Sequence, residues 1–193
     1  MTGTTMIDLG PQARIVAALA ERVTDGHLAG TTPCPAYAVR HLLGHVAGLS
    51  VAFRDAARKD LGPTTATPPG TVTPDIGPGW RAELPKALDE LAEAWRDPDA
   101  WTGMTRAGGI DLPGGVAGAV AADELVVHGW DLARATGQRY VPDPAALEAS
   151  YGFLRMAAQG ERGPFGPVVP VPEGAPLLDR TVGLSGRDPG WKP

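Results

Sequence analysis

A carboxylate and an imidazole four residues apart are the side chains of this sequence best placed to do chemistry. Glu124 and His128 lie in residues 116–132, where repeated valines and leucines predict a long apolar helix. Residues four apart lie one turn above each other, with Cβ atoms about 5–6 Å apart, so both side chains can reach one metal ion. Asp131 continues the same polar strip. Because apolar residues flank the strip on both sides, we expect it to be buried and to need polar partners.

The strip suggests a metal site that needs one more ligand. Zinc enzymes commonly use three protein ligands drawn from histidine and carboxylate, and keep a fourth position for water or substrate. The chain has four histidines. His45 lies at the edge of the apolar stripe of a second predicted helix, whereas His41 lies further from that stripe. We therefore expect Glu124, His128 and His45 to be the ligands, with Asp131 orienting an imidazole.

Other interpretations of these residues stay open at this stage. A Glu-x-x-x-His pair alone is common, as a satisfied core pair or on a solvated helix face. Cys34 stands between two prolines without a partner at metal-binding spacing, and is interpreted as a small buried hydrophobe in a turn. The chain has no glycine-rich loop with phosphate-binding spacing and no Gly-x-Ser-x-Gly nucleophile motif.

Length and composition predict one soluble domain covering residues 1–193. Hydrophobic residues make up 43% and charged residues 20%, which is ordinary for a globular protein. A net charge of −5 argues against nucleic-acid binding. The first eight residues do not resemble a signal peptide, and no apolar run approaches the roughly 20 residues of a membrane span. With a single cysteine, the chain is expected to be cytoplasmic, with no nucleic-acid or membrane partner.

The hydrophobic periodicity predicts an all-α fold. Glycine and proline are clustered in the loops and in a C-terminal tail from residue 160. A short hairpin is expected across Gly108-Gly109, and Pro85 is expected in the first turn of its helix. The expected helices are residues 9–23, 39–59, 84–96, 115–136 and 143–159, with a short one at 175–184. They predict an antiparallel four-helix bundle with an extra helix.

Three segments in order resemble the signatures of a large actinobacterial family. Residues 32–45 (TPCPAYAVRHLLGH) are similar to its first signature, TPCPxWxVRDLLxH, and residues 124–133 (ELVVHGWDLA) are similar to its second. Segments of the tail, at 165–172, 177–180 and 186–189, resemble a third. The family is the metal-binding, DinB-like four-helix bundle group related to the N-terminal domain of mycothiol-dependent maleylpyruvate isomerase. The resemblance spans nearly the whole chain.

The resemblance implies a divalent metal, most often zinc, held between helices by His45, Glu124 and His128. In characterised relatives the metal activates a low-molecular-weight thiol, mycothiol or bacillithiol, for transfer or isomerisation. The chain departs from the family pattern at Tyr37, where tryptophan is usual, and at His41, where aspartate is usual. His41 lies one turn from His45, so it could add a ligand or a proton-transfer group to the site. The isomerase carries an additional C-terminal domain that these residues do not include, so its specific activity is not implied.

Three hypotheses for function follow. The leading one is a metal-dependent enzyme with mycothiol as a candidate cosubstrate, which transfers the thiol to a small electrophilic metabolite or isomerises that metabolite. The second is a thiol-independent enzyme in which a zinc-bound water is the base or nucleophile. The third is a non-catalytic metal-binding module. The expected partners are a small-molecule thiol and an electrophilic substrate, and assembly as a homodimer is left open.

Overall fold

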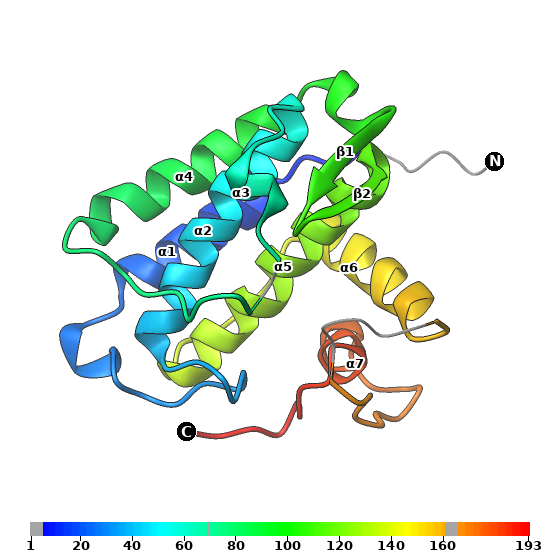
Figure 1. Cartoon of the computed structure of the whole chain (residues 1–193). Helices are drawn as coiled ribbons and strands as arrows, with labels where there is room; N and C mark the ends of the chain where they lie inside the picture. The colour runs from blue at the N-terminus through cyan, green and yellow to red at the C-terminus, as the bar shows by residue number, and fades with distance from the viewer. Residues whose placement is uncertain (1–5, 69, 161–165) are drawn as a thin grey trace.

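A bundle of four long helices forms the body of the protein, seen in a computed structural model that describes residues 6–68, 70–160 and 166–193 (Figure 1). Helix α1 packs against α4 and α5, and α2 packs against the same two helices, so the four enclose one apolar core. Among the described residues no helix is long and apolar enough to cross a membrane. The four helices are α1 (Gly10–Glu21), α2 (Val39–Arg58), α4 (Trp80–Ala94) and α5 (Gly114–Ala135). The all-α, DinB-like bundle predicted from the sequence is confirmed.

Long-range hydrogen bonds define how the helices run. Gln12 at the start of α1 donates to the carbonyl of Leu125, and Gln138, just beyond α5, donates to the carbonyl of Leu19. The packed helices α1 and α5 are therefore parallel, whereas the sequence predicted antiparallel helices throughout the bundle. Lys59, just after α2, donates to the carbonyl of Thr102, and the next carbonyl, that of Gly103, accepts from the N–H of Gly114, the first residue of α5. Helices α2 and α5 are therefore antiparallel and pack along each other. This packing brings the predicted ligand of α2, His45, opposite the predicted ligands of α5, Glu124 and His128.

A small hairpin closes one end of the bundle (Figure 1). Strands β1 (Met104–Ala107) and β2 (Ile110–Pro113) pair antiparallel. The turn between them is Gly108-Gly109, with φ of 58° and 79°. Two successive residues in the left-handed region are what a tight type I′ hairpin turn requires, and glycine adopts that region without strain. The predicted hairpin is confirmed. The remaining short elements are η1 (Asp25–His27), α3 (Pro63–Ala66) and η2 (Pro98–Trp101).

The prediction for the start of α4 was wrong. The helix begins at Trp80, so Pro85 lies inside it and not in its first turn. Pro85 has no N–H to donate to the preceding turn, which normally weakens a helix at that point. Contacts outside the helix hold the extra turn: the indole of Trp80 is buried, and the guanidinium of Arg81 stacks on it and donates to the carbonyl of Val23 at 2.7 Å. These tertiary contacts offset the missing hydrogen bond.

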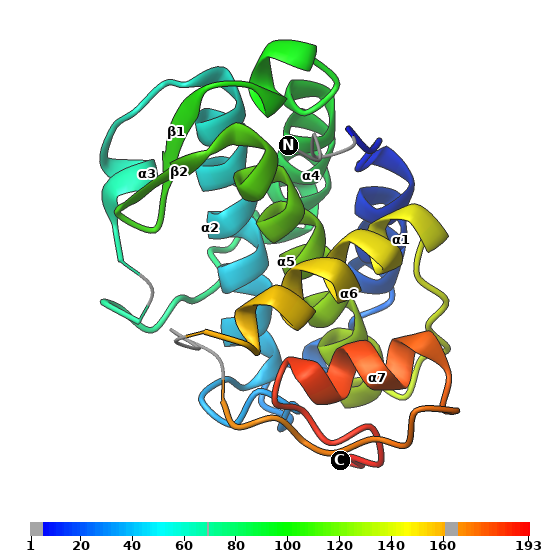
Figure 2. The ribbon, with the colours of Figure 1, turned by 90° about the vertical axis from the view of Figure 1, so that its right-hand side faces the viewer.

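Two further helices lie outside the bundle. Helix α6 (Pro144–Ala157) packs against α5, and α7 (Leu177–Leu184) packs against α6 (Figure 2). The predicted start of α6 is confirmed, because Asp143 accepts a hydrogen bond from the backbone N–H of Ala146 and Pro144 occupies the first turn. The third family signature begins at Phe165, which lies outside the described residues. Pro69 and residues 1–5 lie outside them as well.

Candidate metal centre

The structure brings together the three residues predicted to bind metal. His45 comes from α2, and Glu124 and His128 come from α5. One ligand atom from each residue lies within 4.8 Å of the other two. The oxygen Oε2 of Glu124 is 3.0 Å from Nε2 of His128 and 3.5 Å from Nε2 of His45. Both imidazoles thus present the same ring nitrogen to one carboxylate oxygen.

The hydrophobic pattern of each helix explains this convergence. On α2, the side chains of Leu42, Val46 and Leu49 are buried and fix which face of the helix meets the core, which leaves His45 at the boundary of that face. On α5, the buried Leu125 and Leu132 flank the polar strip. Because α5 is covered by α1, α2 and α6, even its polar positions are enclosed. The cluster therefore forms where α2 meets α5.

The spacing and chemistry of the cluster fit a divalent ion. A tetrahedral zinc ion with bonds of about 2.0–2.2 Å holds its ligand atoms roughly 3.3–3.6 Å apart. The distances of 3.0 and 3.5 Å from the Glu124 oxygen to the two imidazole nitrogens lie close to that spacing. Two imidazoles and one carboxylate are a donor set that zinc accepts readily.

The protonation of the cluster follows from its burial and hydrogen bonds. Burial disfavours the ionised form of Glu124, but hydrogen bonds with His128 and His45 outweigh it and hold the pKa of this carboxyl well below its usual range. Burial also disfavours the His128 imidazolium, yet contacts with Asp131 and Glu124 raise its pKa to about 9. A metal ion that binds here must therefore displace a proton from His128 near neutral pH.

Asp131 supports the cluster from behind. Its side chain is fully buried, and its Oδ2 is 3.0 Å from Nδ1 of His128, as the sequence led us to expect. The second partner of Asp131 was not expected. Arg187, from the segment after α7, donates to both carboxylate oxygens, with Nη2 at 3.0 Å from Oδ2 and Nε at 3.3 Å from Oδ1. The sequence offered one signal for Arg187, its place in the third family signature, and no spacing that links it to α5.

The other candidate residues lie outside this cluster. His41 is half-buried at the start of α2, and its Nδ1 accepts from the backbone N–H of Ala38 at 3.3 Å. Cys34 is half-buried and not enclosed as predicted, because the loop that carries it runs over the surface. Burial raises the pKa of its thiol. The ring of Tyr37 lies beside that of His45, with centroids 5.4 Å apart.

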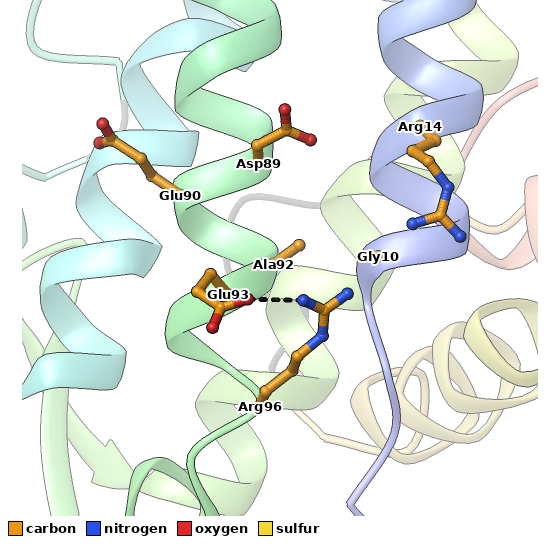
Figure 3. Close-up of a pocket in the computed structure, with 7 residues that line it drawn as sticks. All are labelled: Gly10, Arg14, Asp89, Glu90, Ala92, Glu93 and Arg96. Carbon is orange, nitrogen blue, oxygen red and sulfur yellow. Dashed lines mark hydrogen bonds and ion pairs between the residues drawn. The ribbon is translucent and has the colours of Figure 1, made fainter.

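Two hollows in the surface lie elsewhere, between α1 and α4. One has a volume of about 320 Å³ and the other about 550 Å³, and Arg14 and Asp89 line both. Figure 3 shows the smaller hollow, where Arg96 makes an ion pair with Glu93 at 2.5 Å. Both are lined by charges of either sign, and neither contains a residue of the metal-ligand cluster. We therefore place the candidate site at the cluster.

Comparison with known families agrees with the fold. The family described as mycothiol maleylpyruvate isomerase N-terminal domain matches residues 9–133. The chain belongs to this family. The matched residues include the four-helix bundle except the last two residues of α5, and they include all three members of the cluster. Helices α6 and α7 and Arg187 lie beyond the match.

Individual relatives extend the likeness to most of the chain. Two uncharacterized proteins of Mycobacterium tuberculosis, from strains CDC 1551 / Oshkosh and ATCC 25618 / H37Rv, are each 27% identical over 176 residues, which cover 89% of this chain and 91% of theirs. A crystal structure of a histidine-to-alanine mutant of mycothiol-dependent maleylpyruvate isomerase is similar, with a TM-score of 0.58 at 18% identity over 83% of this chain and 75% of that one. At this identity the likeness establishes the shared helical fold.

Proposed function

We propose that this protein is a metal-dependent enzyme that uses a low-molecular-weight thiol, with mycothiol as the first candidate. The enzyme transfers the thiol to a small electrophilic metabolite or isomerises that metabolite. The observation that carries the proposal is the convergence of His45, Glu124 and His128 at the junction of α2 and α5. Membership of a family named for a mycothiol-dependent isomerase supports the choice of thiol and of reaction class.

The three side chains would hold the ion and leave one position of a tetrahedral site for the thiol. A divalent ion bound there would lower the pKa of the thiol, which then reacts as a thiolate near neutral pH. Neither Cys34 nor His41 joins the cluster, so the described residues offer three candidate ligands and not four. A three-ligand site favours catalysis over a purely structural role.

The exposure of the cluster indicates the side from which small molecules would enter. The side chains of His45 and Glu124 are 26% and 25% exposed, whereas His128 is 9% exposed and Asp131 is fully buried. The site is thus open beside α2 and closed behind α5. Tyr37 lies at the open side, against the ring of His45. A thiol and an electrophile would approach there, with Tyr37 shielding one flank from water.

Formal charges near the site favour an anionic fourth ligand. Glu124 and Asp131 each contribute one negative charge, and Arg187, hydrogen-bonded to Asp131, contributes one positive charge. A divalent ion among these groups and two neutral imidazoles leaves one net positive charge. A thiolate would neutralise that charge in surroundings where burial makes an uncompensated charge costly.

Thiol binding to the metal-loaded protein tests the proposal. Calorimetric titration of the zinc-loaded protein with mycothiol should show saturable binding and release of about one proton near neutral pH. The His128→Ala protein should show neither effect, and His41→Ala, changed on the same helix as His45 but outside the cluster, should behave like the parent. Binding of metal without binding of mycothiol, bacillithiol or glutathione would contradict the thiol mechanism and favour the metal–water alternative. Zinc as the metal, a cytoplasmic location and a homodimer stay predictions.

A further inference from the structure

The C-terminal segment returns to the bundle at the candidate metal centre. After α7 the chain turns at Gly186, whose φ is 85°, and Arg187 enters the protein with 15% of its side chain exposed. Two contacts fix this turn: the N–H of Arg187 donates to the carbonyl of Val182 at 3.1 Å, and its Nη1 donates to that of Ser185 at 3.2 Å. The path of Arg187 is therefore set by the end of α7.

The contact that Arg187 makes compensates a buried charge. Asp131 is fully buried, and it accepts two hydrogen bonds from the guanidinium and one from Nδ1 of His128. The planar guanidinium matches the carboxylate in a paired geometry that fixes the orientation of both groups. The carboxylate in turn decides which ring nitrogen of His128 carries the proton, and so directs Nε2 toward Glu124.

We propose that Arg187 is a positioning residue for the metal centre: through Asp131 it fixes the orientation of His128, and so it sets the affinity of the site for metal. This inference rests on the metal-binding part of the proposed function and adds the C-terminal segment to the site. Without the guanidinium, Asp131 would turn toward other donors or water, and His128 would lose the partner that holds its ring in place. Arg187 itself touches none of the three ligands.

The test compares two substitutions at Arg187 with a matched control in the same segment. Arg187→Gln removes the charge, and Arg187→Lys keeps a buried positive charge but loses the paired geometry. The control is Arg180→Gln, because Arg180 stacks on the ring of Tyr151 at 4.7 Å and contacts its hydroxyl, which ties α7 to α6 away from the centre. For each protein we would measure zinc affinity by competition with a chelator, the visible spectrum of the cobalt-loaded form, and the melting temperature of the metal-free form.

We expect Arg187→Gln to weaken zinc binding by about 10–100-fold, the usual effect of removing a group that orients a ligand. Its cobalt spectrum should change, because one imidazole would no longer be held in place. Arg187→Lys should lie between Arg187→Gln and the parent, and it decides the matter if Arg187→Gln does not fold. Arg180→Gln should lower the melting temperature and leave zinc affinity and the spectrum unchanged.

Two results would overturn the inference. One is zinc affinity and a cobalt spectrum in both Arg187 variants that equal those of the parent. The other is an equal loss of affinity in Arg180→Gln, which would attribute the effect to general loosening of the segment. A parent protein that binds no metal would overturn both the proposed function and this inference. A parent that binds metal, with Arg187 variants that bind it equally well, would overturn this inference alone.

Discussion

At the scale of single residues, one carboxylate oxygen organises the candidate centre. Oε2 of Glu124 faces the Nε2 atoms of both His45 and His128. The spacing of Glu124 and His128 could be predicted, because it depends only on the pitch of one helix. The proximity of His45 to this pair depends on the antiparallel packing of α2 and α5. The apolar stripe of α2 indicated only that His45 lies near the core.

The first prediction concerns metal content. Purified protein should carry close to one divalent ion per chain, and His45→Ala, Glu124→Ala and His128→Ala should each lose most of it, because two ligands hold an ion much less tightly than three. His41→Ala should keep the parent stoichiometry, since its ring lies outside the cluster. Elemental analysis after removal of free metal measures all five proteins. Metal retained in all three ligand variants would contradict the assignment, and loss in His41→Ala would make His41 a ligand.

The second prediction concerns Asp123, which is buried beside the centre and accepts a hydrogen bond from Oγ of Ser150 at 2.7 Å. Burial raises its pKa to about 7, although the Ser150 hydrogen bond opposes this. In the unfolded chain it titrates near its ordinary pKa of about 3.9. The folded form therefore binds the proton more tightly. This stabilisation is complete below about pH 4 and is lost as the pH rises toward 7.

Asp123→Asn should remove that pH dependence while keeping an oxygen that accepts from Ser150. With a chelator present, the free energy of unfolding of the parent should fall between pH 4 and 7 relative to that of the variant, as measured by urea unfolding at several pH values. Curves that stay parallel across this range would show that Asp123 is ionised in the folded protein.

At the scale of helices, a close contact explains a glycine in the middle of α5. A Cβ at Gly129 would lie 2.9 Å from the hydroxyl of Tyr140. That hydroxyl donates to the carbonyl of Val126 and accepts from Nε2 of Gln12, so it links α1, α5 and the segment that leads to α6. The ring cannot move aside without breaking these bonds. The glycine one residue after His128 thus lets the chain pack tightly behind the metal centre.

The third prediction follows from this contact. Gly129→Ala should destabilise the protein by about 1–3 kcal/mol, the usual result of overpacking, although alanine favours a helix. The matched control is Gly152→Ala on α6, where no atom lies within 4 Å of the added Cβ and where we expect a gain of roughly 0.5–1 kcal/mol. Denaturant unfolding measures both. A gain in stability at Gly129 as well would mean that Tyr140 relocates freely.

The longer helices were predictable to within a few residues because each carries an apolar stripe, and the start of α6 and the end of α5 are also recognisable. The four-residue helix α3 was not predicted. Asp143-Pro144 marks the start of α6, and Gly137, with φ of 66°, follows the end of α5. The start of α4 was not predictable, because its first turn depends on Trp80 and Arg81 contacting residues far away in the sequence. Local patterns set most boundaries, and tertiary contacts set the exception.

At the scale of the whole molecule, support for the centre extends beyond the family match. The match ends at residue 133, whereas the guanidinium that pairs with Asp131 comes from residue 187. No sequence rule joins two residues 56 positions apart across a glycine- and proline-rich tail, so this contact needed a structure. That residues 1–193 fold as one domain stays a prediction, which the packing of α6 on α5 and of α7 on α6 favours.

The pairing of Asp131 with Arg187 has a consequence by thermodynamic reciprocity. If docking of the C-terminal segment tightens metal binding by some factor, metal binding must tighten docking of the segment by the same factor. Backbone amides of α7 and of residues 185–187 should then exchange hydrogen more slowly in the zinc-loaded protein than in the metal-free protein, as measured by mass spectrometry. The exchange rate of the segment would then report whether the centre is occupied.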